Sequence, residues 1–239
     1  MIFTGLFYGI FWSCFLGLII GNFATNPIYR LPRGAGLFIE DPYCDSCHAK
    51  LEPRDLFPLF SWIFAKGRCR YCGVVVPGAY ALTEALTAIV FVICYLQFGF
   101  SEKFLLISLG MTSLIMLAMM LVLDGFFSNK TLIASLVLGS LFRTLQDNTI
   151  YNFLGNGYAG LIVGLVIWKL SDRPLVRDVK AFPEYLKLLV VAGVWLSFPQ
   201  LALVLLMMII FMPLKNYIIW LPEWIIIVST ITLVLTNTL

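Results

Sequence analysis

Four cysteines have the spacing of a metal site. Cys44 and Cys47 form one C-x-x-C pair, and Cys69 and Cys72 form a second. A C-x-x-C turn directs two thiolates toward one point, and a second pair completes the tetrahedral shell of a structural zinc site. The alternatives are a disulfide framework or free thiols. Because four thiolates already fill the shell, we expect the single histidine, His48, to be a bystander.

Carboxyl groups are the second set of residues that could do chemistry. Asp124 ends the apolar run 103–123. An acid inside a membrane segment is a functional candidate by default, and the alternative is an ordinary acid that reaches water at a helix end. A second such acid at similar depth would form a pair able to activate water. Glu84 lies near the start of another apolar run, where position alone favours a snorkelling or capping carboxylate.

The composition places these residues in a membrane protein. Hydrophobic residues make up 61% of the 239 residues and charged residues 12%, against about half and a quarter in soluble domains. Seven apolar runs reach or approach the roughly 20 residues that cross a bilayer. One of them, 187–213, is long and contains Pro199, so it could be kinked or split. We therefore expect an all-α polytopic fold of about seven or eight transmembrane helices. The runs are 1–24, 80–100, 104–123, 131–146, 154–170, 187–213 and 217–236.

Basic residues concentrate in two loops of the chain, within 30–74 and 169–187. With seven spans both loops lie on one side, which the positive-inside rule makes cytoplasmic. The N-terminus is then outside, the C-terminus inside, and the first span is retained. Disulfides rarely persist in the reducing cytoplasm, which favours zinc. The expected organisation is a first span at 1–29, a cytoplasmic four-cysteine zinc-knuckle loop at 30–76 and a membrane-embedded helical domain at 77–239.

Six segments of the chain resemble the bacterial type IV prepilin peptidases, which are polytopic aspartic proteases of the inner membrane. The cysteine loop is similar to that family's loop almost position for position, and the elements before and after it have the family's spacing. In the segment 80–88 the resemblance implies a structural or functional role for Glu84, though not a catalytic one. Beyond residue 88 the resemblance is looser. The segments are 21–23, 28–32, 44–47, 55–62, 67–73 and 80–88.

This resemblance implies a first catalytic aspartate at Asp124. Leu123-Asp124 followed by Thr131-Leu132 is similar to the family's first aspartate segment. However, residues 128–130 read Ser-Asn-Lys, where the family usually has Leu-Pro-Asp or Leu-Pro-Asn.

The second catalytic acid implied by the resemblance has no direct counterpart. In the family this acid is the aspartate of a Gly-x-Gly-Asp-x-Lys motif, and a helix follows the motif directly. Residues 187–197 match the sequence of that helix well. Without gaps, however, the aspartate position falls on Tyr185, and Phe182 and Glu184 replace the glycines. Glu184 is one position away. Asp178 keeps the Asp-x-Lys half of the motif seven residues earlier, about two helical turns. The third alternative is a chain without a competent pair.

Membership of this family would imply a membrane aspartic endopeptidase of the bacterial inner membrane that cleaves leader peptides of type IV prepilins or pseudopilins. It would also imply possible methylation of the new N-terminus from S-adenosylmethionine. The alternatives are a catalytically impaired assembly factor for pili or secretion, or a small transporter, for which no internal repeat is evident. The expected partners are the prepilin and the lipid bilayer, with zinc as structural cofactor and no nucleic acid.

Acidic residues of the loop could attract a basic leader, or they could be ordinary solvated charges. They are Glu40, Asp41, Asp45, Glu52 and Asp55.

Overall fold

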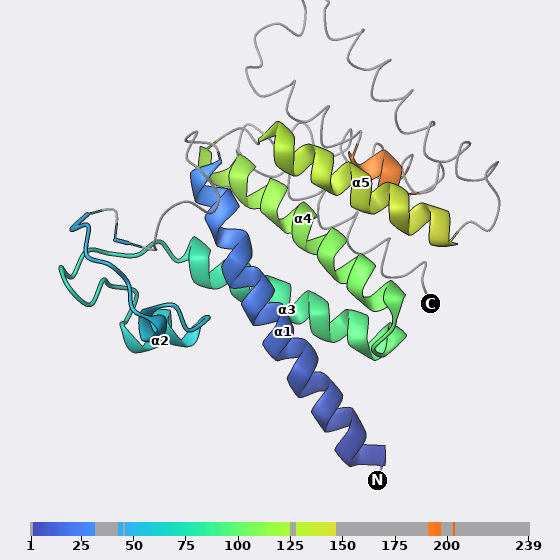
Figure 1. The fold of residues 1–239 in the computed structure, drawn as a ribbon, viewed down its shortest axis with the longest axis horizontal. Coiled ribbons are helices and arrows are strands. Elements are labelled where there is room, and N and C mark those ends of the chain that lie inside the picture. The colour runs from blue at the N-terminus through green and yellow to red at the C-terminus, as the bar shows by residue number, and fades with distance from the viewer. Residues whose placement is uncertain are drawn as a thin grey trace, which may run out of the picture. The chain divides into compact units, whose positions relative to one another are not determined.

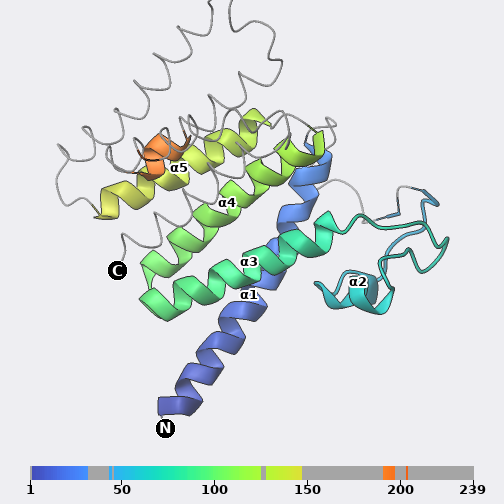
Figure 2. The same ribbon diagram turned by 180° about the vertical axis from the view of Figure 1, so that it is seen from behind.

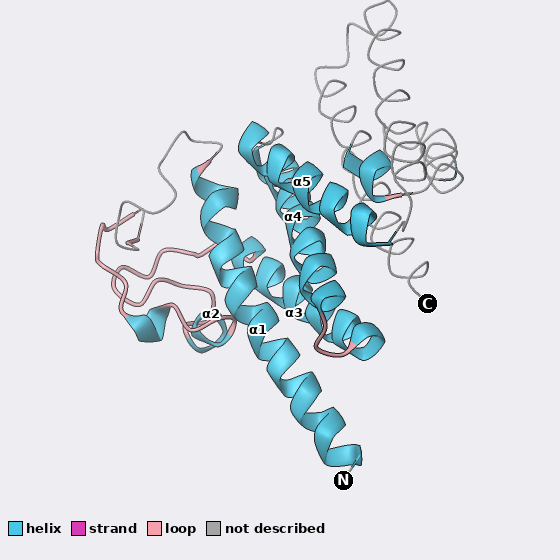
Figure 3. Ribbon diagram, turned by 45° about the vertical axis from the view of Figure 1, so that its right-hand side comes forward, coloured by secondary structure: helices cyan, strands magenta, loops and turns pink. Residues whose placement is uncertain are grey.

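The computed structural model describes residues 2–31, 43, 44, 46–124, 128–146, 191–196 and 203. The described part is mostly helical and contains no β-strand, only two isolated β-bridges. The chain divides into two compact units, Met1–Ser108 and Leu109–Leu239. Figure 3 shows the described helices and the irregular cysteine loop. The elements in chain order are α1 (Ile2–Arg30), η1 (Pro53–Asp55), α2 (Phe60–Phe64), α3 (Ala79–Phe98), α4 (Glu102–Asp124) and α5 (Asn129–Gln146).

Three of these helices, α1, α3 and α4, are long and apolar enough to cross a membrane. This confirms a mostly helical fold with candidate membrane spans, and the positions of these helices agree with the first three apolar runs of the sequence. The apolar part of α5 is shorter, from Asn129 to Phe142. The runs expected at 154–170 and 217–236 lie outside the described residues, as does most of 187–213. The count of seven or eight spans therefore stays a prediction.

Helices α1 and α3 cross in close contact, as Figures 1 and 2 show from opposite sides. Two glycines of α1, one helical turn apart, make this approach possible. A Cβ atom added at Gly17 would lie 2.6 Å from the Cα atom of Ala88, and one at Gly21 would lie 2.7 Å from the Cα atom of Glu84. Such a small-xxx-small stripe lets helix backbones pack directly in a bilayer, where lipid removes the hydrophobic incentive to associate.

Substitution of Gly17 by valine is therefore expected to destabilise the α1–α3 pair by about 1–3 kcal/mol, the usual cost of overpacking. The matched control is Gly5→Val in the same helix, because no atom lies within 4 Å of a Cβ added there. Thermal unfolding of each purified variant in detergent gives the two melting temperatures to be compared. Equal melting temperatures for the two variants would contradict the packing described here.

A short turn connects α3 to the start of α4. Gly99 ends α3 with a φ of 59°, a left-handed conformation that glycine adopts without steric cost. Three aromatic rings close this end of the unit. The ring of Phe104 lies edge-on to Phe91 at 5.7 Å and to Phe100 at 5.4 Å. A three-residue turn therefore leads from α3 into the first turn of α4.

In the second unit, Trp195 packs against glycines of two helices. A Cβ atom at Gly110 of α4 would lie 1.9 Å from the Trp195 ring, and one at Gly139 of α5 would lie 2.9 Å from its indole nitrogen. The ring of Phe142 stacks on the same indole at 5.5 Å. Residues 191–195 are helical, and Trp195 is 1% exposed. The sequence expectation of a helix here is confirmed over these described residues.

Candidate functional site

The four cysteines lie on two tight turns of similar construction. In the first, Tyr43 and Lys50 form an antiparallel bridge, and the amide of Cys44 donates to the carbonyl of Ala49 at 3.0 Å. The amide of His48 donates a hydrogen bond to the carbonyl of Cys44 at 2.8 Å. His48 takes a positive φ of 56°, which closes the turn.

The second turn repeats this pattern around Cys69. Arg68 and Val75 form the antiparallel bridge, and the amide of Cys69 donates to the carbonyl of Val74 at 2.8 Å. The amide of Gly73 donates a hydrogen bond to the carbonyl of Cys69 at 2.9 Å, and Gly73 has a φ of 75°. Each C-x-x-C pair therefore occupies one hydrogen-bonded knuckle.

The two knuckles bring all four sulfur atoms together. The Sγ atoms of Cys44, Cys47, Cys69 and Cys72 lie within 4.8 Å of one another. Those of Cys44 and Cys72 are 3.9 Å apart, far beyond a disulfide bond, and all six cysteines of the chain are free. A tetrahedral zinc site with Zn–S bonds of about 2.3 Å separates its sulfurs by about 3.8 Å. The donor set and its geometry therefore fit zinc, and His48 is not part of the cluster.

The pKa values of two thiols in this cluster, Cys69 and Cys47, are shifted in opposite directions. The amides of Cys72 and then Tyr71 donate to the Cys69 sulfur and lower its pKa to about 7. For Cys47, hydrogen bonding to the backbone at Ala49 lowers the pKa, but desolvation and the nearby Cys72 and Cys44 outweigh it and raise the pKa to about 11. The Cys69 thiol therefore ionises more readily than the Cys47 thiol, and the positive charge of a bound metal would favour the thiolate form of both.

Asp55 connects the short helix η1 to the second knuckle. Its carboxylate accepts hydrogen bonds from the Tyr71 hydroxyl at 3.1 Å and the amide of Glu52 at 3.1 Å, and it pairs with Arg70 at 3.3 Å. Glu52 forms an ion pair with Arg54 at 2.6 Å. Two of the loop acids that could attract a leader are thus engaged within the loop. The other three, Glu40, Asp41 and Asp45, lie outside the described residues.

Glu84 joins the cysteine loop to the membrane helices. It is 5% exposed, and its carboxylate accepts from the side-chain amide of Asn22 on α1 at 2.8 Å and from the backbone amide of Leu59 at the start of α2. Beside it, the rings of Tyr29 and Tyr80 stack at 4.0 Å. These contacts agree with the structural role that the family resemblance implies, whereas the alternative of a snorkelling or capping carboxylate is wrong. The side chain points inward because two donors, distant in sequence, meet it there.

Removal of this carboxylate by Glu84→Ala is expected to destabilise the unit by about 3 kcal/mol, since hydrogen bonds to a charged group contribute about 1.5–3 kcal/mol each. Asn22→Ala, which removes one of the two donors, should cause a smaller loss. Thermal unfolding and limited proteolysis of the loop measure the effect. A Glu84→Ala protein as stable and as protease-resistant as wild type would refute this role.

Asp124 is the last residue of α4, as the sequence predicts, and its side chain is partly buried. Beyond it, Ser128 caps α5: its hydroxyl accepts from the amide of Lys130 at 3.3 Å, and its carbonyl accepts from the amide of Leu132 at 3.1 Å. The two candidates for the second acid, Asp178 and Glu184, lie outside the described residues. The pairing of acids therefore stays a prediction.

Sequence reasoning missed the partners of Glu84. Asn22 was visible only as part of the Gly-Asn-Phe element, and Leu59 contributes through its backbone amide. Leu59 has a φ of 60°, a backbone conformation that leucine rarely adopts and that its residue type therefore does not predict. A polar residue in an apolar run, such as Asn22, was the one available signal of a buried partner.

Comparison with known proteins fits this combination of membrane helices and a four-cysteine loop. Residues 15–98 match the model of the bacterial peptidase A24 N-terminal domain. The prepilin leader peptidase/N-methyltransferase of Klebsiella pneumoniae is 29% identical over 215 residues, which cover 84% of this chain and 92% of the relative. The corresponding protein of Aeromonas salmonicida is 27% identical over 237 residues, covering 84% and 80%.

The match to the Bacillus subtilis prepilin leader peptidase/N-methyltransferase is 28% identical over 146 residues, and it spans 56% of that relative's length. No solved structure gives a significant match. Together the matches define the class as a helical membrane protein related to leader-processing enzymes. The chain thus carries a segment that matches the bacterial peptidase A24 N-terminal domain and is similar to prepilin leader peptidases over most of its length, which confirms the resemblance found in the sequence.

Proposed function

We propose that this protein is a membrane aspartic endopeptidase that removes the leader peptide of type IV prepilins or pseudopilins. The observation that carries this proposal is the similarity to the Aeromonas and Klebsiella leader peptidases, each over 84% of the chain. These matches extend well beyond the cysteine loop, into the region that contains Asp124, Asp178 and Glu184.

The reaction requires two carboxyl groups around one water. We assign one of them to Asp124 and the other to Glu184 or Asp178. The ionised carboxyl takes a proton from the water, whose oxygen attacks the peptide carbonyl, while the protonated carboxyl donates to the carbonyl oxygen. Collapse of the resulting diol breaks the C–N bond, and the amine leaves with a proton. Two nearby acids differ in pKa because they cannot both ionise cheaply.

The four-cysteine cluster would hold a structural zinc ion. Structural sites of this kind use four protein ligands and leave no position open for substrate, so the metal would stabilise the loop and take no part in hydrolysis. Folding of a loop this small depends on such a metal. Methyl transfer to the new N-terminus from S-adenosylmethionine is part of the proposal because the relatives are named N-methyltransferases. No residue of this chain is assigned to it.

The proposed topology is multi-pass in the bacterial inner membrane, with the cysteine loop in the cytoplasm. If α1, α3 and α4 each cross the bilayer, alternation of the chain puts the end of α1, the cysteine loop and Asp124 on the same side. The basic residues of the loop favour the cytoplasm as that side. A leader that enters from the cytoplasm could then meet Asp124 at the membrane surface.

A second candidate function is an assembly factor without peptidase activity. The altered second motif favours it: Phe182 and Glu184 stand where the family has glycines, and Tyr185 stands where it has the aspartate. Bulky residues at these positions would change how closely a substrate backbone could approach.

The test is coexpression of the full-length protein with a prepilin, with leader removal followed as a gel shift. We expect cleavage by wild type and by one of the two variants Asp178→Asn and Glu184→Gln, and none by the other, which identifies the second acid. Absence of cleavage of prepilins that the Aeromonas relative processes would favour the assembly role instead.

A further inference from the structure

Three phenylalanines of the cysteine loop form an exposed surface, which we call the aromatic face. Phe57, Phe60 and Phe64 are 51%, 43% and 81% exposed. Their ring centroids are separated by 5.7 Å and 6.4 Å in succession, so the face is continuous. Ile63, on the same short helix α2, is 51% exposed. Exposed apolar groups gathered in this way mark an interaction surface.

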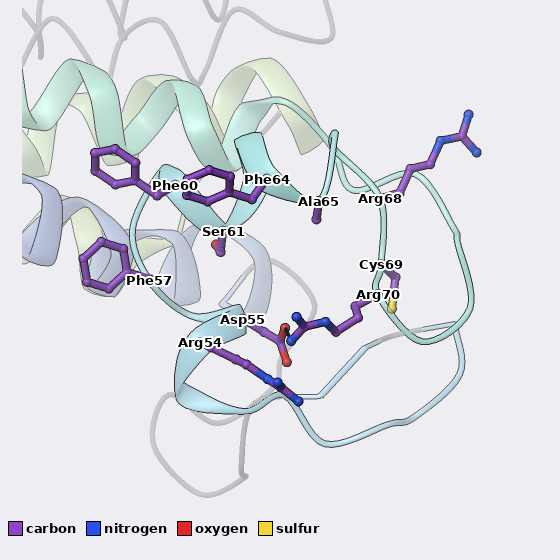
Figure 4. A pocket seen from close by; sticks show the side chains of 10 residues that line it. All are labelled: Arg54, Asp55, Phe57, Phe60, Ser61, Phe64, Ala65, Arg68, Cys69 and Arg70. Atoms are coloured by element: carbon purple, nitrogen blue, oxygen red, sulfur yellow. Dashed lines mark hydrogen bonds and ion pairs between the residues drawn. The ribbon is translucent and has the colours of Figure 1, made fainter.

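Arginines lie beside the aromatic face. Three arginines and the three phenylalanines of the aromatic face line an open hollow of about 720 Å³, shown in Figure 4. The arginines are Arg54, Arg68 and Arg70. Arg54 and Arg70 are engaged by Glu52 and Asp55. Arg68 has no ion-pair partner among the residues that the structure describes, and its side chain extends away from the loop in Figure 4. The surface therefore combines apolar rings with an available cation.

The hydrogen bond from Leu59 to Glu84 fixes where this surface lies along α3. Glu84 is five residues beyond Ala79, the first residue of α3, which is about 7.5 Å along a helix axis. The interfacial layer on each side of a bilayer is of similar thickness, about 5–7 Å. Leu59 lies between Phe57 and Phe60 in the chain, so this hydrogen bond holds the aromatic face beside the first turns of α3, at the end of the helix where a spanning α3 would enter the bilayer.

We propose that the aromatic face is a docking surface for anionic phospholipid on the membrane side that carries the loop. The phenyl rings insert at the boundary between headgroups and acyl chains, and Arg68 binds the lipid phosphate. Aromatic and cationic side chains are the residue types that anchor proteins at this boundary. The docking would hold the zinc loop flat against the bilayer. The inference rests on membrane insertion of α1 and α3 and is independent of peptidase activity.

Photo-crosslinking of the full-length protein tests this placement. p-Benzoylphenylalanine replaces Phe64 in one sample and Lys50, an exposed residue of the first knuckle, in another. Single chains are placed in nanodiscs of phosphatidylcholine, or of phosphatidylcholine and phosphatidylglycerol in equal parts. We expect phospholipid adducts by mass spectrometry at position 64, at least about tenfold above position 50. Equal yields at the two positions, or crosslinks from position 64 to protein alone, would overturn the proposal.

The anionic part of the proposal has its own readout. Phosphatidylglycerol should raise the yield of lipid adducts at position 64 several-fold, and Arg68→Ala should abolish that increase. Lys103→Ala removes a similar exposed charge in the first turn of α4, beyond the end of α3 that is far from the cysteine loop, and should leave the increase intact. A yield that does not respond to phosphatidylglycerol, or that responds equally in both variants, would overturn the role of Arg68. Retained zinc content shows that each variant keeps its loop folded.

Discussion

Asp124→Asn is expected to lower leader removal by at least about 10²-fold, because an amide can neither accept the proton of the attacking water nor donate as an acid. Asparagine has nearly the shape of aspartate, so the end of α4 should remain folded. The measurement is the initial rate of prepilin cleavage by purified protein in liposomes, at equal amounts of folded enzyme.

The matched control for this prediction is Glu102→Gln, which neutralises an exposed acid at the first residue of the same helix. It should cleave at the wild-type rate. Similar rates for Asp124→Asn and wild type would exclude Asp124 from the chemistry, whereas a slow Glu102→Gln protein would show that charge on α4 matters for another reason.

Loss of one cysteine of the cluster is expected to empty the whole metal site. Purified wild-type protein should contain one zinc ion per chain, and Cys72→Ser should contain almost none. Structural zinc contributes an apparent binding free energy on the order of 10 kcal/mol that is also folding free energy. The loop of Cys72→Ser should therefore be cut rapidly by protease, whereas the helices stay protected.

Cys14→Ser provides the control for the cysteine variant. Cys14 lies on α1, outside the cluster, and this variant should keep both the zinc and the protected loop. Wild-type protein that is folded and protease-resistant without zinc would contradict a structural metal site.

The cysteine cluster could be predicted from sequence because its information is local. Each C-x-x-C pair specifies one knuckle within a few residues, and hydrogen bonds such as the amide of Cys69 to the carbonyl of Val74 close it. The first three apolar helices were also predictable, since an uninterrupted apolar run has few alternatives to a membrane helix.

The environment of Glu84 could not be predicted, because it depends on contacts between segments far apart in the chain. Asn22 is 62 residues away and Leu59 is 25 residues away. Their meeting requires the close crossing that Gly17 and Gly21 allow. Segments of the chain that resemble the family separately, around Gly21, Tyr29, Leu59 and Glu84, come together at this one place in the structure.

The second acid could not be predicted for a different reason. Tyr185 replaces the expected aspartate, so the choice between Glu184 and Asp178 depends on the path of the backbone and not on residue type. Pro183 precedes Glu184 and disfavours a continuous helix through this segment. Spacing that assumes regular helix cannot decide between the two acids.

The most direct test of the peptidase assignment is the intact mass of a prepilin after incubation with the purified wild-type protein in liposomes. The Aeromonas salmonicida relative serves as the positive control on the same substrate. We predict that the mass falls by that of the leader with both enzymes, and that the Asp124→Asn protein leaves the prepilin at full length. A prepilin that stays at full length with wild-type protein, but is shortened by the relative, would contradict the account.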